Sequence, residues 1–254
     1  MKRHLQFELE RLKKRILLMA GMAEESVQHA VRALKARDLE LAQKVIDADQ
    51  AMNDLEVEIE EDCLKILALH QPVAVDLRFI AAVIKINNDL ERVGDMAVNI
   101  AERVLVLAKV PPVTLAFDFD SMSAKVESML KMSLDSLVNL DADMAYRVGL
   151  MDDEVDSMNH RCYDLVKQAI KREPERVKCF INLLLACRHL ERIADHATNI
   201  AEEVVYMIEG EIHRHKSEIF EKPMSEKLSV PAGHPPMRAA GRVMLKGEGM
   251  IEKR

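Results

Sequence analysis

The chain repeats itself, and this repeat constrains the fold more than any other feature of the sequence. Residues 90–102 read LERVGDMAVNIAE and residues 190–202 read LERIADHATNIAE, with nine of thirteen positions identical at an offset of 100. Upstream, four residues recur at an offset of 103, namely Asp38, Ala42, Val45 and Asp49 against Asp141, Ala145, Val148 and Asp152. Because similar composition alone does not put identical polar residues at matched positions, the pattern predicts two copies of one unit.

Apolar spacing and proline positions predict that each unit is helical. Between Ile80 and Val104 apolar and small residues recur at steps of three and four, which is the period of a helix. Prolines mark the joints, because proline breaks helix interiors. Asp38 and Asp141 are placed as N-caps and Gly210 as a helix stop. The predicted helical segments are 3–36, 39–70, 73–109, 120–140, 142–172 and 175–209.

The predicted fold is all-α, with two tandem three-helix bundles and a tail. Only eight glycines and eight prolines are present, too few turn residues for a sandwich or barrel of many short strands. The first bundle is assigned to residues 1–110 and the second to 111–216. Residues 217–254 are rich in Ser, Pro, Gly and basic residues and are predicted to be disordered. Within them, Met237–Leu245 is a short amphipathic stretch that would suit a partner.

Charge and cysteine content narrow the class of protein. The net charge of −7 divides into −10 for residues 1–220 and +3 for residues 221–254, and an acidic body argues against binding to nucleic acid. The four cysteines form no Cys-x-x-Cys pair and lie in helical patterns, which favours buried free thiols in a reducing cytosol. The apolar run Ile16–Ala23 is too short to span a bilayer, so we expect a cytoplasmic protein.

The repeated polar residues form acidic stripes. Four polar residues recur at spacings of four, four and three, which places them on a single face of a helix. They are Glu91, Asp95, Asn99 and Glu102 in the first repeat and Glu191, Asp195, Asn199 and Glu202 in the second. The preceding helices carry further stripes, which contain Asp49, Asn53, Glu56 and Glu60 in the first repeat and Asp152, Asp156 and Asn159 in the second. Stacked carboxylates repel one another, and a bound cation would offset that repulsion.

The ligand types select the metal. Asp, Glu and Asn offer oxygen, which suits hard cations such as Mg²⁺, Mn²⁺, Ca²⁺ or iron rather than zinc. The predicted metal ligands are Asp49, Asn53, Glu91, Asp95, Asn99, Asp152, Asp156, Glu191, Asp195 and Asn199. The alternative is that these are ordinary solvated helix faces, salt-bridged by Arg92, Arg103, Arg188 and Arg192.

The sequence shows no catalytic constellation. It contains no arrangement of nucleophile and base, no Gly-rich phosphate loop and no Glu-x-x-His motif of a di-iron oxidase, so we expect that the protein is not an enzyme. His196 adjoins Asp195, but Met96 stands at the matching position, which places the histidine outside the repeated design. Arg78, one turn after the Pro72 joint, is either an anion site at a helix N-terminus or a salt-bridge partner.

Two stretches of the chain resemble a known family. QPVAVDLRFIAAVIKINNDLERVGDMAVNIAE (71–102) and HLERIADHATNIAEEVVYMIEG (189–210) are similar to the signature stretches of the PhoU family, the accessory proteins of phosphate transport. The resemblance covers about residues 1–215. It implies paired three-helix bundles in pseudo-two-fold relation, assembled as a homodimer.

The resemblance also implies a function and a site. Members of the family are negative regulators of the phosphate-starvation response and of phosphate uptake. They link the ATPase subunit of the phosphate ABC transporter to a PhoR-type histidine kinase, which implies a cytoplasmic protein held at the inner face of the membrane through its partners. Family metal clusters use paired acidic motifs, which map onto Glu91/Asp95, Glu191/Asp195, Asp49/Asn53 and Asp152/Asp156. Asn53 departs from the pattern, so the first site should bind metal more weakly.

Two other functions stay open from the residues alone. The same carboxylates would serve a metal-dependent enzyme or a metal store. The protein would equally serve as an accessory of a different phosphate transporter, of the single-subunit symporter type.

Overall fold

The computed structural model describes residues 2–211, which form six α-helices and one short 3₁₀ turn and include no strand. The helices are α1 (Lys2–Ala36), α2 (Leu39–His70), α3 (Ala74–Leu107), α4 (Phe119–Asn139), α5 (Ala142–Arg172) and α6 (Val177–Glu209), with the 3₁₀ turn Pro174–Arg176 before α6. The all-α prediction is confirmed, and the predicted segments end within a few residues of the helices. The tail predicted for 217–254, including Met237–Leu245, lies outside the described residues.

Matched turns fold each repeat back on itself. Arg37 and Leu140 adopt left-handed backbone conformations, with φ of 53° and 51°. The next residue in each turn is the predicted N-cap: the Asp38 carboxylate accepts a hydrogen bond from Leu41 N (3.0 Å) and the Asp141 carboxylate accepts one from Met144 N (2.9 Å). A side-chain oxygen at this position satisfies an otherwise free helical N–H. Both N-cap predictions are confirmed.

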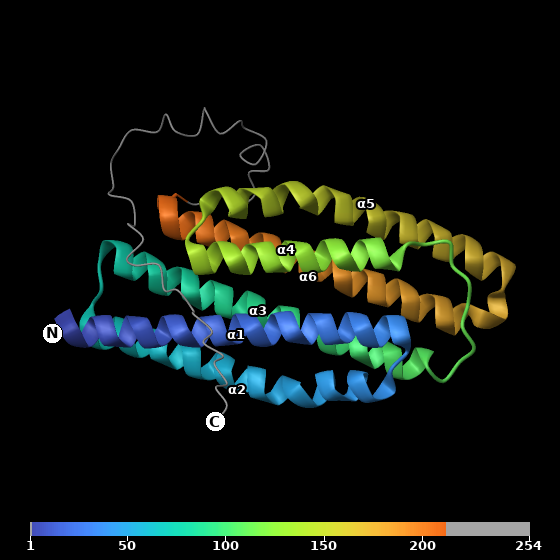
Figure 1. Ribbon diagram of the computed structural model, residues 1–254, viewed down its shortest axis with the longest axis horizontal. Helices are drawn as coiled ribbons and strands as arrows, with labels where there is room; N and C mark the ends of the chain where they lie inside the picture. Colours follow the sequence, from blue (N-terminus) through green and yellow to red (C-terminus); the bar gives the residue numbers. More distant parts are fainter. Residues whose placement is uncertain (1, 212–254) are drawn as a thin grey trace, which may run out of the picture.

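The six helices form two three-helix bundles that lie side by side (Figure 1). Helices α1, α2 and α3 pack against one another, as do α4, α5 and α6. The most extensive contact in the molecule joins α3 of one bundle to α6 of the other, and α1 also touches α4. In Figure 1, α1 and α4 run in opposite directions, and so do α3 and α6. The repeats are therefore related by an approximate two-fold axis across the α3–α6 contact.

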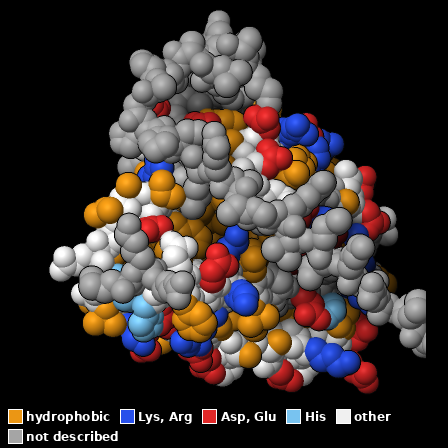
Figure 2. All heavy atoms as spheres, turned by 60° about the vertical axis from the view of Figure 1, so that its left-hand side comes forward, with side chains coloured by type: hydrophobic (Ala, Val, Ile, Leu, Met, Phe, Trp, Pro, Cys, Tyr) orange, Lys and Arg blue, Asp and Glu red, His pale blue; other side chains and the backbone are white. Residues whose placement is uncertain are grey.

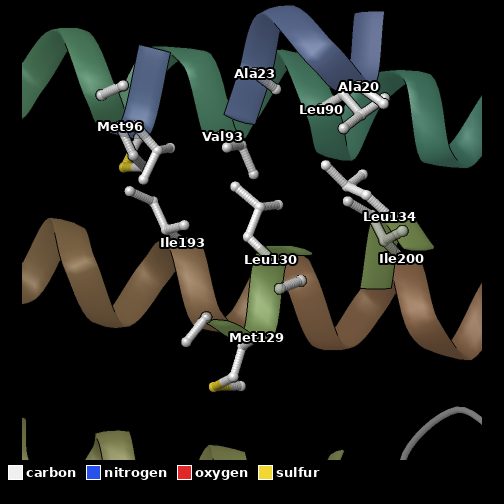
Figure 3. Packing of buried hydrophobic residues seen from close by; sticks show 14 of the residues in the cluster. Ala20, Ala23, Leu90, Val93, Met96, Met129, Leu130, Leu134, Ile193 and Ile200 are labelled. Atoms are coloured by element: carbon white, nitrogen blue, oxygen red, sulfur yellow. The ribbon is translucent and has the colours of Figure 1, made fainter. Parts of the chain in front are cut away.

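The hydrophobic core continues across this contact. Figure 3 shows Met96 and Val93 of α3 pointing toward Ile193 of α6 and Leu130 of α4, and Leu90 of α3 pointing toward Leu134 of α4 and Ile200 of α6. These residues belong to one cluster that includes buried side chains from all six helices. Burying such a cluster is the main favourable term in folding, so the two bundles are held as one body by the same force that forms each of them.

Within the first bundle, one glycine allows a close approach beside the acidic stripe. A methyl group at Gly94 of α3 would meet the side-chain end of Met52 on α2. The second repeat has Ala194 at the matching position of α6 and the shorter Val155 on α5. The first repeat pairs Gly94 with the long Met52 and the second pairs Ala194 with the shorter Val155, so the second and third helices of each repeat pack closely.

Two other sequence predictions are addressed by the described residues. All four cysteines are buried and free, as expected. Across residues 2–211, none of the helices combines the length and the apolar character needed to cross a membrane.

Candidate functional site

In the first repeat, the acidic stripes of α2 and α3 face each other. Burial raises the pKa of Asp49, a hydrogen bond from Asn53 lowers it, and the charge of Asp95 on α3 raises it. Burial also raises the pKa of Glu91, and the charges of Asp95 and Glu56 add to this effect. Each carboxylate is influenced by a charge on the opposite helix, so these predicted ligands line one face of the α2–α3 contact.

This first site is partly balanced by its own residues. Asn53 Nδ2 donates to Asp49 Oδ2 (3.1 Å), while Asn53 Oδ1 is buried without a hydrogen-bond partner. Arg92 forms ion pairs with Glu91 (Nε to Oε2, 3.4 Å) and with Asp95 (3.0 Å). Glu91 Oε2 is nevertheless buried and makes no hydrogen bond. The arginine pairing matches the solvated-face alternative, whereas the unsatisfied Asn53 Oδ1 matches a ligand site.

The acidic residues of the second repeat repel one another more strongly than those of the first. Burial, followed by the charges of Asp195 and Asp156, raises the pKa of Asp152 from 3.8 to about 6. Burial, followed by the charges of Glu191 and Asp156, likewise raises the pKa of Asp195 to about 6. Burial and the charge of Asp156 raise the pKa of Glu191. Helices α5 and α6 therefore bring four predicted ligands together, and none of the ion pairs found in residues 2–211 includes them.

The amide nitrogens of two of the three predicted asparagine ligands, Asn99 and Asn199, donate to groups away from the facing stripes. Asn99 Nδ2 donates to the backbone oxygen of Asp95 in its own helix (2.8 Å). Asn199 Nδ2 donates to Asp89 Oδ1 (3.2 Å), which belongs to α3 in the other bundle. The structure thus brings the acidic predictions together on the α2–α3 and α5–α6 faces, and it directs the Asn199 amide toward the contact between the bundles.

Sequence reasoning misses Thr198, which does face the second site. Its Oγ1 donates to Asp152 Oδ1 (3.4 Å), a bond that lowers the pKa of Asp152. Thr198 follows Glu191 by two helical turns, so helical spacing would have found it. The repeat comparison hides it, because Val98 occupies the matching position in the first repeat.

A second missed feature is a polar ladder across the α3–α6 contact. Asp89 accepts from His196 (2.9 Å), and Lys85 Nζ lies 3.0 Å from both carboxylate oxygens of the buried Glu203. The placement of His196 outside the repeated acidic design agrees with this role. At the matching positions of the other repeat stand His189, Met96, Leu185 and Arg103, so the ladder has no counterpart there.

Arg78 packs against the C-terminal end of α6. Its guanidinium occupies the space where a side chain at residue 210 would stand, and Gly210 has a φ of 82°. Both facts require a glycine, which confirms Gly210 as the stop of the last helix. Cationic groups are favoured at helix C-termini, and this accounts for Arg78 without either the anion or the salt bridge that the sequence left open.

The chemistry available at both acidic faces is oxygen ligation. In the described part of the chain, no three His, Cys, Asp or Glu side chains are gathered closely enough to enclose a metal ion. The acidic residues flank a shared face instead of forming a closed cage. The oxygen donors, the unsatisfied Asn53 Oδ1 and the raised pKa values of Asp152 and Asp195 all fit a hard cation.

Known proteins resemble the whole body of the chain. The family described as "PhoU domain" matches twice, over residues 16–104 and 119–204. A "Phosphate-specific transport system accessory protein PhoU homolog" of Aquifex aeolicus is 40% identical over 209 residues, which cover 82% of this chain and 95% of the relative. The homolog of the same description from Pseudomonas aeruginosa is 36% identical, covering 82% of this chain and 86% of the relative.

Solved structures resemble the fold described above. The crystal structure of PhoU from Pseudomonas aeruginosa superposes with a TM-score of 0.79 at 36% identity and covers 81% of this chain and 99% of that one. The phosphate transport system regulatory protein PhoU from Streptococcus pneumoniae gives a TM-score of 0.72 at 31% identity, covering 82% and 98%.

Proposed function

Since the chain belongs to the PhoU family, we propose that it is a negative regulator of the phosphate-starvation response and of phosphate uptake. An accessory role in phosphate-specific transport is common to the names of its relatives. In our proposal the protein is a cytoplasmic adaptor, without enzymatic activity, between the ATPase subunit of the phosphate ABC transporter and a PhoR-type histidine kinase. The double family match over both bundles is the observation that carries this proposal.

The continuous core supports an adaptor. An adaptor that couples two partners must hold its two binding faces in fixed relation, and one hydrophobic cluster joins both bundles here. The Lys85–Glu203 and Asp89–His196 contacts add fixed polar links between α3 and α6. A partner bound to one bundle therefore meets a body whose other bundle does not reorient freely.

We further propose that hard cations bind the acidic faces. Asp152, Asp156, Glu191 and Asp195 would hold the stronger site and Asp49, Asn53, Glu91 and Asp95 the weaker one. The support is electrostatic: burial and neighbouring carboxylates raise the pKa values of Asp152 and Asp195, and Thr198 is a neutral donor to Asp152. A bound cation would supply positive charge and fix the spacing between the two helices. The residues themselves would then present a less acidic surface to a partner.

The regulatory proposal is tested by gene deletion. Loss of the gene should leave phosphate-starvation genes switched on in high phosphate, as measured with a reporter. The wild-type gene should restore repression, and so should Asp153→Asn, which alters an exposed acid beside the site. Asp152→Asn with Asp195→Asn should restore it poorly if metal is required. Normal repression in the deletion strain would contradict the adaptor role.

Biochemistry separates the adaptor from the two alternatives. Purification from membranes under high phosphate should recover a phosphate ABC transporter and a histidine kinase. Recovery of a single-subunit symporter instead would identify a different transporter accessory. Elemental analysis that finds many metal ions per chain, or turnover in a hydrolase or oxidase screen, would favour a metal store or an enzyme.

A further inference from the structure

The contact between the two bundles leaves one groove at each of its ends. Because α1 and α4 run in opposite directions, as do α3 and α6, each end brings together two helix starts and two helix ends (Figure 1). The linker-end groove is lined by the last part of α1, the end of α3, the start of α4 and the first half of α6. The tail-end groove is lined by the start of α1, the start of α3, the end of α4 and the end of α6. The approximate two-fold axis exchanges the two grooves.

At the linker end, the chain itself lies against the groove. Residues 108–118 connect α3 to α4, and their apolar side chains, Val113, Leu115 and Phe117, pack against the core cluster. Phe117 lines the groove with Phe119, at 4.8 Å between ring centroids. Two arginines hold this segment by its backbone: Arg37 donates to Val110 O (2.9 Å) and Arg176 donates to Pro112 O (3.1 Å).

At the tail end, the matching groove is apolar and has an acidic rim. It measures about 180 Å³, and its apolar lining includes Leu9, Leu17, Phe79, Leu137, Leu140 and Met207. Glu10 and Asp76 stand at its rim with Lys13. Figure 2 looks onto this end of the molecule and shows apolar side chains within a hollow flanked by charged ones.

The repeat indicates which segment belongs there. Residues 108–118 directly follow α3. In the second repeat the corresponding stretch of sequence directly follows α6, whose residue Met207 lines the groove. Phe117 and Phe119 come ten and twelve residues after the end of α3. Ile219 and Phe220 come ten and eleven residues after the end of α6. Residues 212–220 carry Arg214 and Lys216 against the single acid Glu218, and this net charge of +1 complements the acidic rim.

We propose that residues 212–220 dock in the tail-end groove, with Ile219 and Phe220 against its apolar lining. The docked segment closes the contact between the bundles at this end, as residues 108–118 do at the other. It also covers apolar surface that would otherwise be open to a partner or to a second copy of the chain. This proposal does not depend on the phosphate role.

The absence of tryptophan from the sequence allows a direct test in the full-length protein. Phe220→Trp introduces the single indole, and Leu245→Trp is the matched control in the same terminal region. Docking predicts a blue-shifted emission for Phe220→Trp and quenching by acrylamide several-fold weaker than for Leu245→Trp. Equal quenching of the two variants would overturn the proposal.

Changes in the groove locate the binding surface. Leu17→Glu places a charge in the lining and should shift Phe220→Trp emission to the red while helicity by circular dichroism is unchanged. If Leu17→Glu does not fold, Glu10→Lys alters only the exposed rim and should weaken docking in the same direction. If neither change shifts the emission, the segment does not bind in this groove. A blue shift that grows with protein concentration would show that a second copy occupies the groove, and this outcome also contradicts the proposal.

Discussion

The two acidic faces use the same helical positions but differ in how their charge is balanced. In the first repeat, an asparagine replaces one acid and Arg92 forms ion pairs with two others. In the second repeat the matching acid is Asp156, and the pKa values of Asp152 and Asp195 rise to about 6. Duplication has therefore preserved the backbone arrangement while the electrostatics diverged. The first face is partly balanced by its own arginine, whereas the second shows the larger rise in carboxylate pKa.

The largest expected effect is the loss of cation binding at the second face. Asp152→Asn with Asp195→Asn removes half of its four carboxylates, so stabilisation by Mn²⁺ or Mg²⁺ should largely disappear. A ligand at a hundredfold excess over its Kd stabilises a protein by about 2.7 kcal/mol, which sets the scale of the lost thermal shift. Thermal unfolding with and without the cation, together with elemental analysis, measures the effect.

The matched control for that experiment is Asp49→Asn with Glu91→Gln in the first repeat. It removes the same number of charges from the first face, with Asp49 at the position that matches Asp152 and Glu91 one turn before the position that matches Asp195, and its loss of cation stabilisation should be smaller. An equal or larger loss in the first repeat would reverse the ranking of the two faces.

A tenfold effect is expected from making the first face resemble the second. Asn53→Asp supplies an acid at the position that matches Asp156 of the second repeat. Added ligand charge strengthens the binding of hard cations to oxygen ligands, and we expect the cation affinity to rise about tenfold. Calorimetric titration of the metal measures the change. Gln50→Glu adds the same charge at an exposed position of α2 and should leave the affinity unchanged. If both variants bind equally tightly, net charge and not ligand geometry sets the affinity.

The repeated sequence made most of the fold predictable, because caps and stops are local features. Asp38, Asp141 and Gly210 act through hydrogen bonds and backbone conformations within a few residues, so reading the chain locates them. The pairing of Asp152 with Asp195 was also accessible, since helical spacing places both on facing stripes. These features depend on the helix period and on nothing farther away in space.

The remaining features depend on how the bundles pack. The direction of the Asn199 amide toward Asp89 and the pairing of Lys85 with Glu203 arise from the antiparallel contact of α3 with α6. No spacing in the sequence specifies that contact. Thr198 could not be found by comparing the repeats, because Val98 stands at the matching position of the first repeat.

A smaller effect concerns the pH dependence of stability in the metal-free protein. Because folding raises the pKa of Asp152, the folded state holds a proton between about pH 4 and 6 that the unfolded state has released. The group therefore favours folding at low pH, and its contribution falls as pH rises through this interval. Above pH 6, Asp152→Asn should stabilise the metal-free protein by on the order of 1 kcal/mol, reduced from the full shift because the side chain is partly exposed.

The measurement is thermal unfolding in EDTA from pH 4.5 to 7.5. The difference between wild type and Asp152→Asn reports this carboxylate together with its effect on Glu191, whose pKa the charge of Asp152 raises. Asp153→Asn removes one of the charges that raise the pKa of Asp152, so it should change stability in the same direction by a smaller amount. A wild-type stability that rises relative to Asp152→Asn over this interval would show that the carboxylate is stabilised in the folded state, and the second face would then have no unmet need for a cation.

The smallest expected effect tests whether Arg92 acts through its ion pairs or through the general electrostatic field of the acidic surface. Arg92 is half exposed and pairs with Glu91 and Asp95, so Arg92→Gln should cost the metal-free protein about 0.5 kcal/mol, the usual scale of such pairs. It should also tighten cation binding at the first face, because the arginine competes for the same carboxylates. Arg192→Gln is the equivalent change in the second repeat, where the described ion pairs do not include Arg192, and its cost should be smaller. Equal costs in denaturant unfolding would mean that both arginines act through the general field of the acidic surface. The faces would then differ through the residues that line them, such as Asn53 against Asp156 and Glu56 against Asn159, and Asn53→Asp should narrow the difference in cation affinity without removing it.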